Sequence, residues 1–348
     1  MTDRQVNSRP VVTAAMHGAA LWRRLLVGLG LGILVLAALA VVADVRTVLP
    51  TLAGFSWELL PVVLLLTAGN YACRFLKWEL YLRWVGVPDF PRRWSLAVFL
   101  SGFAMSITPG KVGEWLKAYL VSRLGGGAVA PLVPVVAAER LTDGIAMLVL
   151  GLVSAAVGSG WGWKPLGLLA VIVLIALWLL QEERVVRPVL RFAGRAPVIR
   201  KRADAVEAVY EAARALVSWR RLVLVSGLSV FSWSLECTGL FLILVGLGLR
   251  PELELLTVAT FVLSTASIAG ALSLLPGGLG AAEAGITGLL LLLRPDVSTA
   301  VAATATVLIR LGTLWFGVFL GALALLWIQQ RVLRSTEQRG VEREEVGT

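Results

Sequence analysis

Eight long apolar stretches constrain this chain more than any other feature of its sequence. They lie at about 25–43, 57–81, 95–122, 132–157, 165–181, 222–248, 256–293 and 299–328. An α-helix needs roughly 20 apolar residues to cross the hydrocarbon core of a bilayer. The chain is also 58% hydrophobic and only 16% charged, whereas soluble domains are about 25% charged. We therefore expect an all-α polytopic membrane protein.

The net charge of +10 does not require a nucleic-acid partner. Basic residues collect in the cytoplasmic loops of membrane proteins, where they also attract anionic lipid headgroups. Cys73 and Cys237 lie in apolar stretches and His17 is the only histidine, so we expect neither a disulfide framework nor a zinc site. We expect no cofactor, and membrane lipids with anionic headgroups as the partners. A second copy of the chain or a lipid-synthesising protein is left open as a protein partner.

The chain divides into two tails and one membrane domain. We expect a cytoplasmic N-terminal tail at 1–24, a single transmembrane domain at 25–328 and a cytoplasmic C-terminal tail at 329–348. The segment at about 182–221 is rich in arginine, and its apolar residues recur at helical spacing: Val206, Val209, Tyr210, Ala213, Leu216 and Val217. One apolar stripe on a basic helix is typical of a helix lying on the cytoplasmic membrane surface.

Two of the apolar stretches are interrupted where a spanning helix should still be apolar. The first reads SITPGKVGE at 106–114 and the second SLLPGGLGA at 273–281. Proline ends a helix and glycine allows a sharp turn. Each break is either a surface loop between ordinary spans or the tip of a re-entrant hairpin. The tip residues would be Pro109, Gly110 and Gly113 in the first, and Pro276, Gly277 and Gly280 in the second.

The distribution of basic residues favours the hairpins. Arginines place the N-terminus, the loops on both sides of 95–122 and the C-terminus in the cytoplasm. The stretch 95–122 therefore begins and ends on the cytoplasmic side. The stretch 256–293 begins and ends on the outer side. This predicts about six full transmembrane helices and two opposed re-entrant helical hairpins in the plasma (inner) membrane. Segments of about 57–157 and 222–328 then form an inverted repeat, an arrangement found in secondary transporters. Arg140-Leu141 matches Arg310-Leu311 in this repeat. A helix that begins just after Gly113 or Gly280 would offer its N–H groups to an anion.

Polar and ionisable residues inside membrane segments are costly and mark a candidate site for substrate binding or transport. The candidates are Asn70, Arg74, Lys111, Glu114, Glu139, Arg140, Asp143, Glu236, Glu283 and Arg310. Asn70, Arg74 and Lys77 share one helix face. Arg310 has no acid in its own helix, so Glu236 and Glu283 are its candidate partners. For some residues a structural role is the alternative: Arg140 pairs with Asp143 or Glu139, and the side chains of Lys77, Glu79 and Lys117 extend to the inner surface.

Several of these motifs together resemble the lysylphosphatidylglycerol synthase transmembrane-region family of flippase-like membrane proteins. They are NYACRFLKW at 70–78, SITPGKVGE at 106–114, ERLTD at 139–143, LPGGLGAAE at 275–283 and Arg310. In that family the membrane domain stands alone or is fused to a cytoplasmic aminoacyl-lipid synthase, and the fused proteins move lysyl-phosphatidylglycerol to the outer leaflet. Since the chain ends about twenty residues after the last apolar stretch, we expect a stand-alone domain without aminoacyl transfer. The resemblance also admits polyprenyl-phosphate-linked sugars as substrates.

We therefore expect translocation of an anionic lipid or lipid-linked intermediate between leaflets, with the headgroup between the two hairpin tips. The pattern GxxxxGK[ST] is absent, so we expect no direct drive by ATP. An ion-coupled transporter of a small solute is the alternative. A membrane enzyme acting on a lipid phosphate is a further one, although no DxD, HExxH or GxSxG spacing is present.

Overall fold

Helices make up the whole of the described chain apart from its connecting turns. The computed structural model describes residues 27, 30–35, 37–38, 41, 44–107, 115–158, 162–182, 184, 187–188 and 203–346, and no strand occurs among them. The α-helices are α3 (Val45–Ala53), α4 (Leu59–Trp84), α5 (Arg92–Ala104), α6 (Leu116–Arg123), α7 (Val133–Val157), α8 (Trp163–Gln181), α11 (Ala203–Leu216), α12 (Trp219–Gly246), α13 (Leu253–Leu272), α14 (Ala281–Leu293), α15 (Thr299–Arg310) and α16 (Phe316–Val346). Short 3-10 turns are η1 (Met105–Ile107), η3 (Ala130–Leu132) and η4 (Pro276–Gly278), and a π-helical turn, η5 (Leu311–Trp315), joins α15 to α16.

Seven candidate membrane-spanning segments occur in the described residues, so this is an all-helical, multi-pass protein. They are Leu59–Trp84, Ala130–Val157, Trp163–Gln181, Trp219–Gly246, Leu253–Leu272, Pro276–Leu293 and Thr299–Val332. Five of them match predicted full spans to within a few residues. The predicted span at 25–43 is described only in part. The second interrupted stretch, 256–293, forms two arms that are each long enough to cross, whereas α5 and α6 in the first are shorter.

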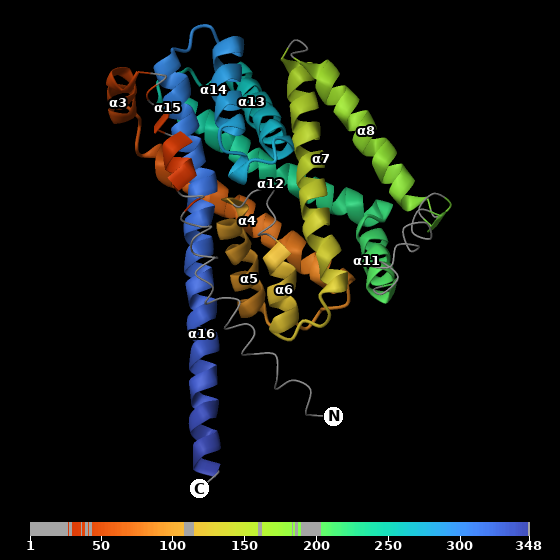
Figure 1. Ribbon diagram of the computed structural model, residues 1–348. Helices are drawn as coiled ribbons and strands as arrows, with labels where there is room; N and C mark the ends of the chain where they lie inside the picture. Colours follow the sequence, from red (N-terminus) through yellow and green to blue (C-terminus); the bar gives the residue numbers. More distant parts are fainter. Residues whose placement is uncertain are drawn as a thin grey trace.

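The helices pack in pairs that join distant parts of the sequence. The two long helices α4 and α12 lie against each other, α16 runs along α5, and α7 packs on α13 (Figure 1). In the view of Figure 1, α13 and α14 occupy the upper half and α5 and α6 the lower half. Where the two pairs approach each other, η1 lies against η4. The two interrupted stretches therefore meet inside the protein, and their meeting point positions the site described below.

The turn between α13 and α14 has the conformation that its glycines predict. Gly277, Gly278 and Gly280 have φ of 61°, 67° and 85°, in the left-handed region that side chains disfavour. A Cβ added at Gly278 would also lie 3.1 Å from Gly270 Cα, so this turn packs directly on α13. Leu274 has φ of 55° without being glycine, which is a strained conformation. The corresponding turn in the first half, with Pro109, Gly110 and Gly113, lies outside the described residues.

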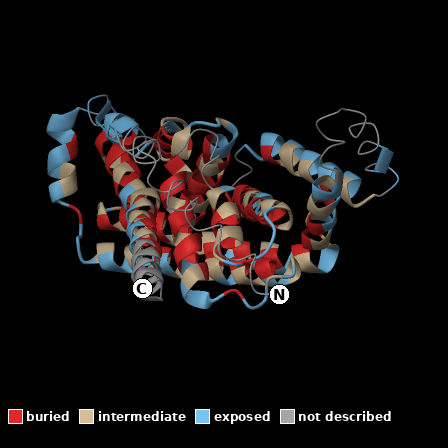
Figure 2. Cartoon of the chain, turned by 60° about the horizontal axis from the view of Figure 1, so that its bottom comes forward, coloured by how far each residue is buried: buried red, intermediate tan, exposed pale blue. Residues whose placement is uncertain are grey.

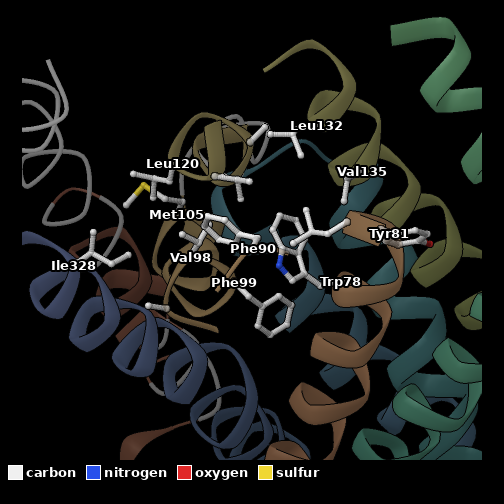
Figure 3. Close-up of a cluster of buried hydrophobic side chains, with 14 of the residues drawn as sticks. Trp78, Tyr81, Phe90, Val98, Phe99, Met105, Leu120, Leu132, Val135 and Ile328 are labelled. Atoms are coloured by element: carbon white, nitrogen blue, oxygen red, sulfur yellow. The ribbon is translucent and has the colours of Figure 1, made fainter. Parts of the chain in front are cut away.

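Two large apolar cores surround the two interrupted stretches, and each core contains side chains from both halves of the chain. One surrounds α5 and α6 and contains Trp78, Phe99 and Ile328 (Figure 3). The other surrounds α13 and α14 and contains Leu240, Val262 and other aliphatic side chains. Buried residues concentrate along the centre of the molecule and exposed ones lie at its periphery (Figure 2). Among the described spans α8 is the most exposed, and its apolar side chains face outward, as lipid contact requires.

The segment predicted as an amphipathic helix at about 182–221 contains the helix α11, Ala203–Leu216, and the start of α12. Tyr210, Leu216 and Val217 from the predicted apolar stripe are buried, and α11 packs on α7 and η3. Part of the stripe therefore contacts protein. Its position on the cytoplasmic membrane surface stays a prediction.

Gly321 permits the close approach of α16 to α5. A Cβ added there would lie 2.7 Å from the carbonyl oxygen of Leu100 and closer still to the backbone nitrogen of Ala104. Since backbone atoms cannot rotate away, Gly321→Ala should lower the free energy of unfolding by about 1–3 kcal/mol. Gly288→Ala is the matched control, because that helical glycine has open space around it. Thermal unfolding in detergent should therefore show a lower midpoint for the first variant only; equal midpoints would contradict the packing.

Candidate functional site

The carboxylate of Asp143 gathers three cations in the middle of the protein. Its Oδ1 lies 2.6 Å from Lys77 Nζ, and its Oδ2 lies 3.4 Å from Arg74 Nη2 and 3.8 Å from Arg140 Nη2. Arg74 and Lys77 come from α4, whereas Asp143 and Arg140 lie one turn apart on α7. The predicted pairing of Arg140 with Asp143 is confirmed, and the cluster joins two helices. Burial of these charges is tolerable because each has an opposite charge beside it.

The alternative in which Lys77 reaches the membrane surface is wrong. The ammonium group of Lys77 is buried and donates to Thr142 Oγ1 at 3.2 Å and Ser229 Oγ at 2.8 Å, besides its aspartate partner. All three of its donors are thus used inside the protein. Glu79 is half-buried and accepts a short hydrogen bond from Ser95, so the same alternative stays a prediction for this residue.

The structure places Glu139 away from the other candidates, in the core around α5 and α6. It forms a short ion pair with Lys117, and both side chains are buried. The Lys117 ammonium also lies 4.9 Å from the ring centre of Trp78 and 5.7 Å from that of Phe99. Lys117 therefore does not extend to the inner surface either. This pair fastens α6 to α7 and has a structural role.

Asn70 has a similar structural role where α4 packs on α12. It is fully buried, its amide nitrogen donates to the carbonyl of Ser232 at 2.9 Å, and Ser232 Oγ donates to the carbonyl of Asn70 at 3.2 Å. These reciprocal bonds fix α4 to α12. The predicted common face of Asn70, Arg74 and Lys77 is confirmed, but only Arg74 of the three reaches the cavity described below.

Arg310 holds the turn between α13 and α14 in place. Its Nε donates to Glu283 Oε1 at 2.6 Å and its Nη2 donates to the carbonyl of Gly277 at 2.8 Å. Glu283 was one of its two predicted partners. The other oxygen of Glu283 accepts from the N–H of Gly280 at 2.7 Å and caps α14. The helix terminus predicted to seat an external anion therefore already holds an internal carboxylate.

A cavity of about 140 Å³ lies where the two interrupted stretches meet. It is larger than the 10–15 Å³ that one water requires. Its polar lining includes Arg74, Arg140, Arg310 and Glu236, contributed by α4, α7, α15 and α12. Ser106 from the end of η1 and the glycines of η4 complete the junction. Four of the ten predicted site residues thus face one cavity, and Asp143 and Glu283 orient its arginines from behind.

Two buried donors in the cavity wall have no hydrogen-bond acceptor among the described residues. They are Arg74 Nε and the indole nitrogen of Trp233. Buried donors are normally paired, so these two favour a ligand with several acceptor oxygens. Tyr71 also lines the cavity, but its hydroxyl donates to the carbonyl of Thr313 at 2.7 Å. Sequence reasoning did not select Trp233 because an indole in an apolar helix is indistinguishable from a lipid-facing one.

Two further predicted site residues, Lys111 and Glu114, lie outside the described residues. They belong to the segment 108–114, as do the predicted tip residues Pro109, Gly110 and Gly113. The described site is therefore the part built by α4, α7, α12, α15 and the second turn.

A double substitution can test whether Lys117 and Glu139 act as a structural ion pair. Lys117→Met or Glu139→Leu alone leaves one buried charge without its partner and should cost about 3–5 kcal/mol of stability. The double variant Lys117→Met/Glu139→Leu removes both charges and should recover most of that loss. Thermal unfolding of the three variants in detergent measures this coupling. Additive losses would mean that the two side chains do not act as a pair.

Comparisons with known proteins agree with the motifs and the helical architecture. The family model for the lysylphosphatidylglycerol synthase TM region matches residues 25–321. Two curated relatives from Methanothermobacter thermautotrophicus (strain Delta H) are each described as a UPF0104 membrane protein. One is 23% identical over 311 residues, covering 84% of this chain and 90% of the relative. The other is 28% identical over 279 residues, covering 72% and 79%. No solved structure matches. Because the family model matches nearly all of the membrane domain, the chain belongs to the lysylphosphatidylglycerol synthase TM region family.

Proposed function

We propose that this protein moves an anionic lipid, or a lipid-linked intermediate, between the two leaflets of the membrane. The observation that carries the proposal is the convergence of Arg74, Arg140 and Arg310 on one cavity. They come from three different helices, so no local sequence pattern accounts for their meeting. Guanidinium groups bind phosphate oxygens with paired hydrogen bonds, and a phosphate is the group that most membrane lipids share.

The charge of the site favours one anionic group. Four cations, Arg74, Lys77, Arg140 and Arg310, stand against three carboxylates, Asp143, Glu236 and Glu283. One positive charge is therefore in excess when all three acids are ionised, and a phosphodiester carries one negative charge. Arg140 is the most accessible of the three cavity arginines, with a side chain 31% exposed, so it would meet the phosphate first.

An apolar surface beside the cavity favours a lipid over a soluble solute. Leu272, Leu274 and Leu275 directly precede η4 and are 67%, 69% and 45% exposed. A solute transporter gains nothing from exposed leucines next to a polar cavity, whereas an acyl chain would cover them while its headgroup is held inside. The chemistry we propose makes and breaks no covalent bond, so the protein would act as a transporter and not as an enzyme.

We further propose that α5–α6 and α13–α14 are opposed re-entrant hairpins of an inverted repeat. The helix pairs support this assignment. Exchanging the two repeats maps α4 onto α12, α5 onto α13 and α7 onto α15–α16, so the pairs α5–α16 and α7–α13 become equivalent. Each hairpin is also fastened by one ion pair to the helix that follows it, with reversed sign: Lys117 to Glu139 in one and Glu283 to Arg310 in the other. Alternate opening of two such halves is how inverted-repeat transporters expose a central site to each side.

Removing the most accessible arginine should slow lipid movement. Arg140→Gln removes a charged donor worth about 1.5–3 kcal/mol to a bound phosphate, so we expect translocation to fall roughly 10–100-fold. The assay follows acyl-labelled phosphatidylglycerol in reconstituted vesicles by chemical quenching of the outer leaflet. Arg184→Gln is the control, since its side chain is 95% exposed and distant from the cavity lining. An unchanged rate for folded Arg140→Gln would refute this site.

Labelling of introduced cysteines tests the inverted topology. The chosen positions are Ala128 and Pro295, which are exposed and lie beyond α6 and α14. Neighbouring Gly126 is unsuitable, because a Cβ there would lie 2.8 Å from the carbonyl oxygen of Val121. In a background in which Cys73 and Cys237 are replaced by serine, an impermeant thiol reagent should reach Pro295→Cys from outside and Ala128→Cys only after the membrane is opened. The reverse pattern at either position removes the inverted repeat.

A further inference from the structure

Glu236 differs from the other buried carboxylates of the site. It lies on α12, is only 6% exposed and lines the cavity. Asp143, Glu139 and Glu283 each form an ion pair at 3.8 Å or less. Within the described part of the chain no hydrogen bond and no ion pair to the Glu236 carboxylate is found. An ionised carboxylate loses its hydration in such a place and receives no direct contact in return.

Three of the four helices that pack on α12 place titratable groups near Glu236. Arg74 and Tyr71 lie on α4, Arg140 and Asp143 on α7, and Arg310 on α15. Each of these groups makes a direct contact with a residue other than Glu236. Arg74 and Arg140 contact Asp143, and Arg310 contacts Glu283 and Gly277. The hydroxyl of Tyr71 donates to the carbonyl of Thr313. The remaining helix, α13, has no ionisable side chain between residues 255 and 272. Burial and three charged groups that act through space, Arg74, Asp143 and Arg310, thus determine the environment of the Glu236 carboxylate.

A bound headgroup would change that field. A phosphate held by Arg74 and Arg310 brings a second anion beside the Glu236 carboxylate. Repulsion between two anions in one site raises the free energy of the state in which both are charged. Uptake of one proton by Glu236 removes the repulsion. The proton adds to a carboxylate oxygen, and no bond in the lipid is made or broken. The loaded cavity then has the same net charge as the empty one.

We propose that Glu236 is a proton-binding site that couples the movement of the anionic lipid to the movement of one proton in the same direction. This inference rests on the proposed function and adds its energy source. One proton and one monoanionic headgroup together carry no net charge. A pH gradient should therefore drive the lipid towards the more alkaline side, whereas a membrane potential alone should not. One-to-one coupling gives about a tenfold difference between the leaflets for each pH unit.

The test uses the full-length protein in phosphatidylcholine vesicles with a trace of acyl-labelled phosphatidylglycerol. With a gradient of one pH unit, the wild type should enrich the label in the leaflet that faces the alkaline side by up to about tenfold. Glu236→Gln cannot exchange a proton and should show no enrichment. Glu254→Gln, at an exposed site near the start of α13, is the matched control and should behave as the wild type. Enrichment that persists in Glu236→Gln, or that follows a membrane potential imposed at equal pH, overturns the proposal.

Infrared spectroscopy tests proton binding by Glu236 independently of lipid movement. Infrared difference spectra of the wild type between acidic and alkaline pH should contain the band of a protonated carboxyl group, and that band should be missing in Glu236→Gln. A spectrum that Glu236→Gln leaves unchanged refutes the proton site, whatever the vesicles show. If the folded wild type moves no phosphatidylglycerol at equal pH, the proposed function is contradicted for this lipid. The infrared spectra then decide whether Glu236 binds a proton.

Discussion

Compensation of buried charge is the constraint on which the structure of this protein depends. An ion inside a bilayer is tolerated only where another charge or a polar cavity offsets its lost hydration. Asp143 meets this requirement for two helices at once, because its carboxylate contacts cations from both α4 and α7. The same carboxylate orients the guanidinium groups of Arg74 and Arg140 towards the cavity. Packing of the helices and formation of the site are therefore consequences of one set of contacts.

The second turn obeys the same constraint for backbone groups. A chain that turns back inside a membrane exposes N–H and carbonyl groups, which need partners within the protein. Arg310 binds the carbonyl of Gly277, and its partner Glu283 binds the N–H of Gly280. One ion pair thus satisfies both ends of the turn and holds it against the cavity. This explains why a span can contain an arginine with no acid in its own helix.

Much of the fold could be predicted from the sequence because apolar length and helical spacing are local properties. Five spans and the two interruptions follow from such patterns. For Arg310 the sequence left two candidate partners, Glu236 and Glu283, and the fold selects Glu283. The roles of Lys77 and Lys117 could not be predicted, since a lysine near a helix end is equally suited to reach the surface or an acid on another helix. Only the tertiary arrangement brings Glu139 to Lys117 and Thr142 and Ser229 to Lys77. The contacts of α11 with α7 and η3 could not be predicted for the same reason: an apolar stripe does not specify which surface it packs on.

The two halves use their charges differently, and the difference bears on mechanism. The pair of Lys117 and Glu139 is buried beside an apolar core, joins α6 to α7 and does not line the cavity. The pair of Arg310 and Glu283 borders the cavity, so a ligand that binds Arg310 also acts on the contacts that hold the second turn. Binding of a phosphate and the position of that turn are therefore linked through a single side chain. In the inverted repeat that we propose, such a link would let the headgroup itself loosen one side of the cavity while the other side keeps its contacts.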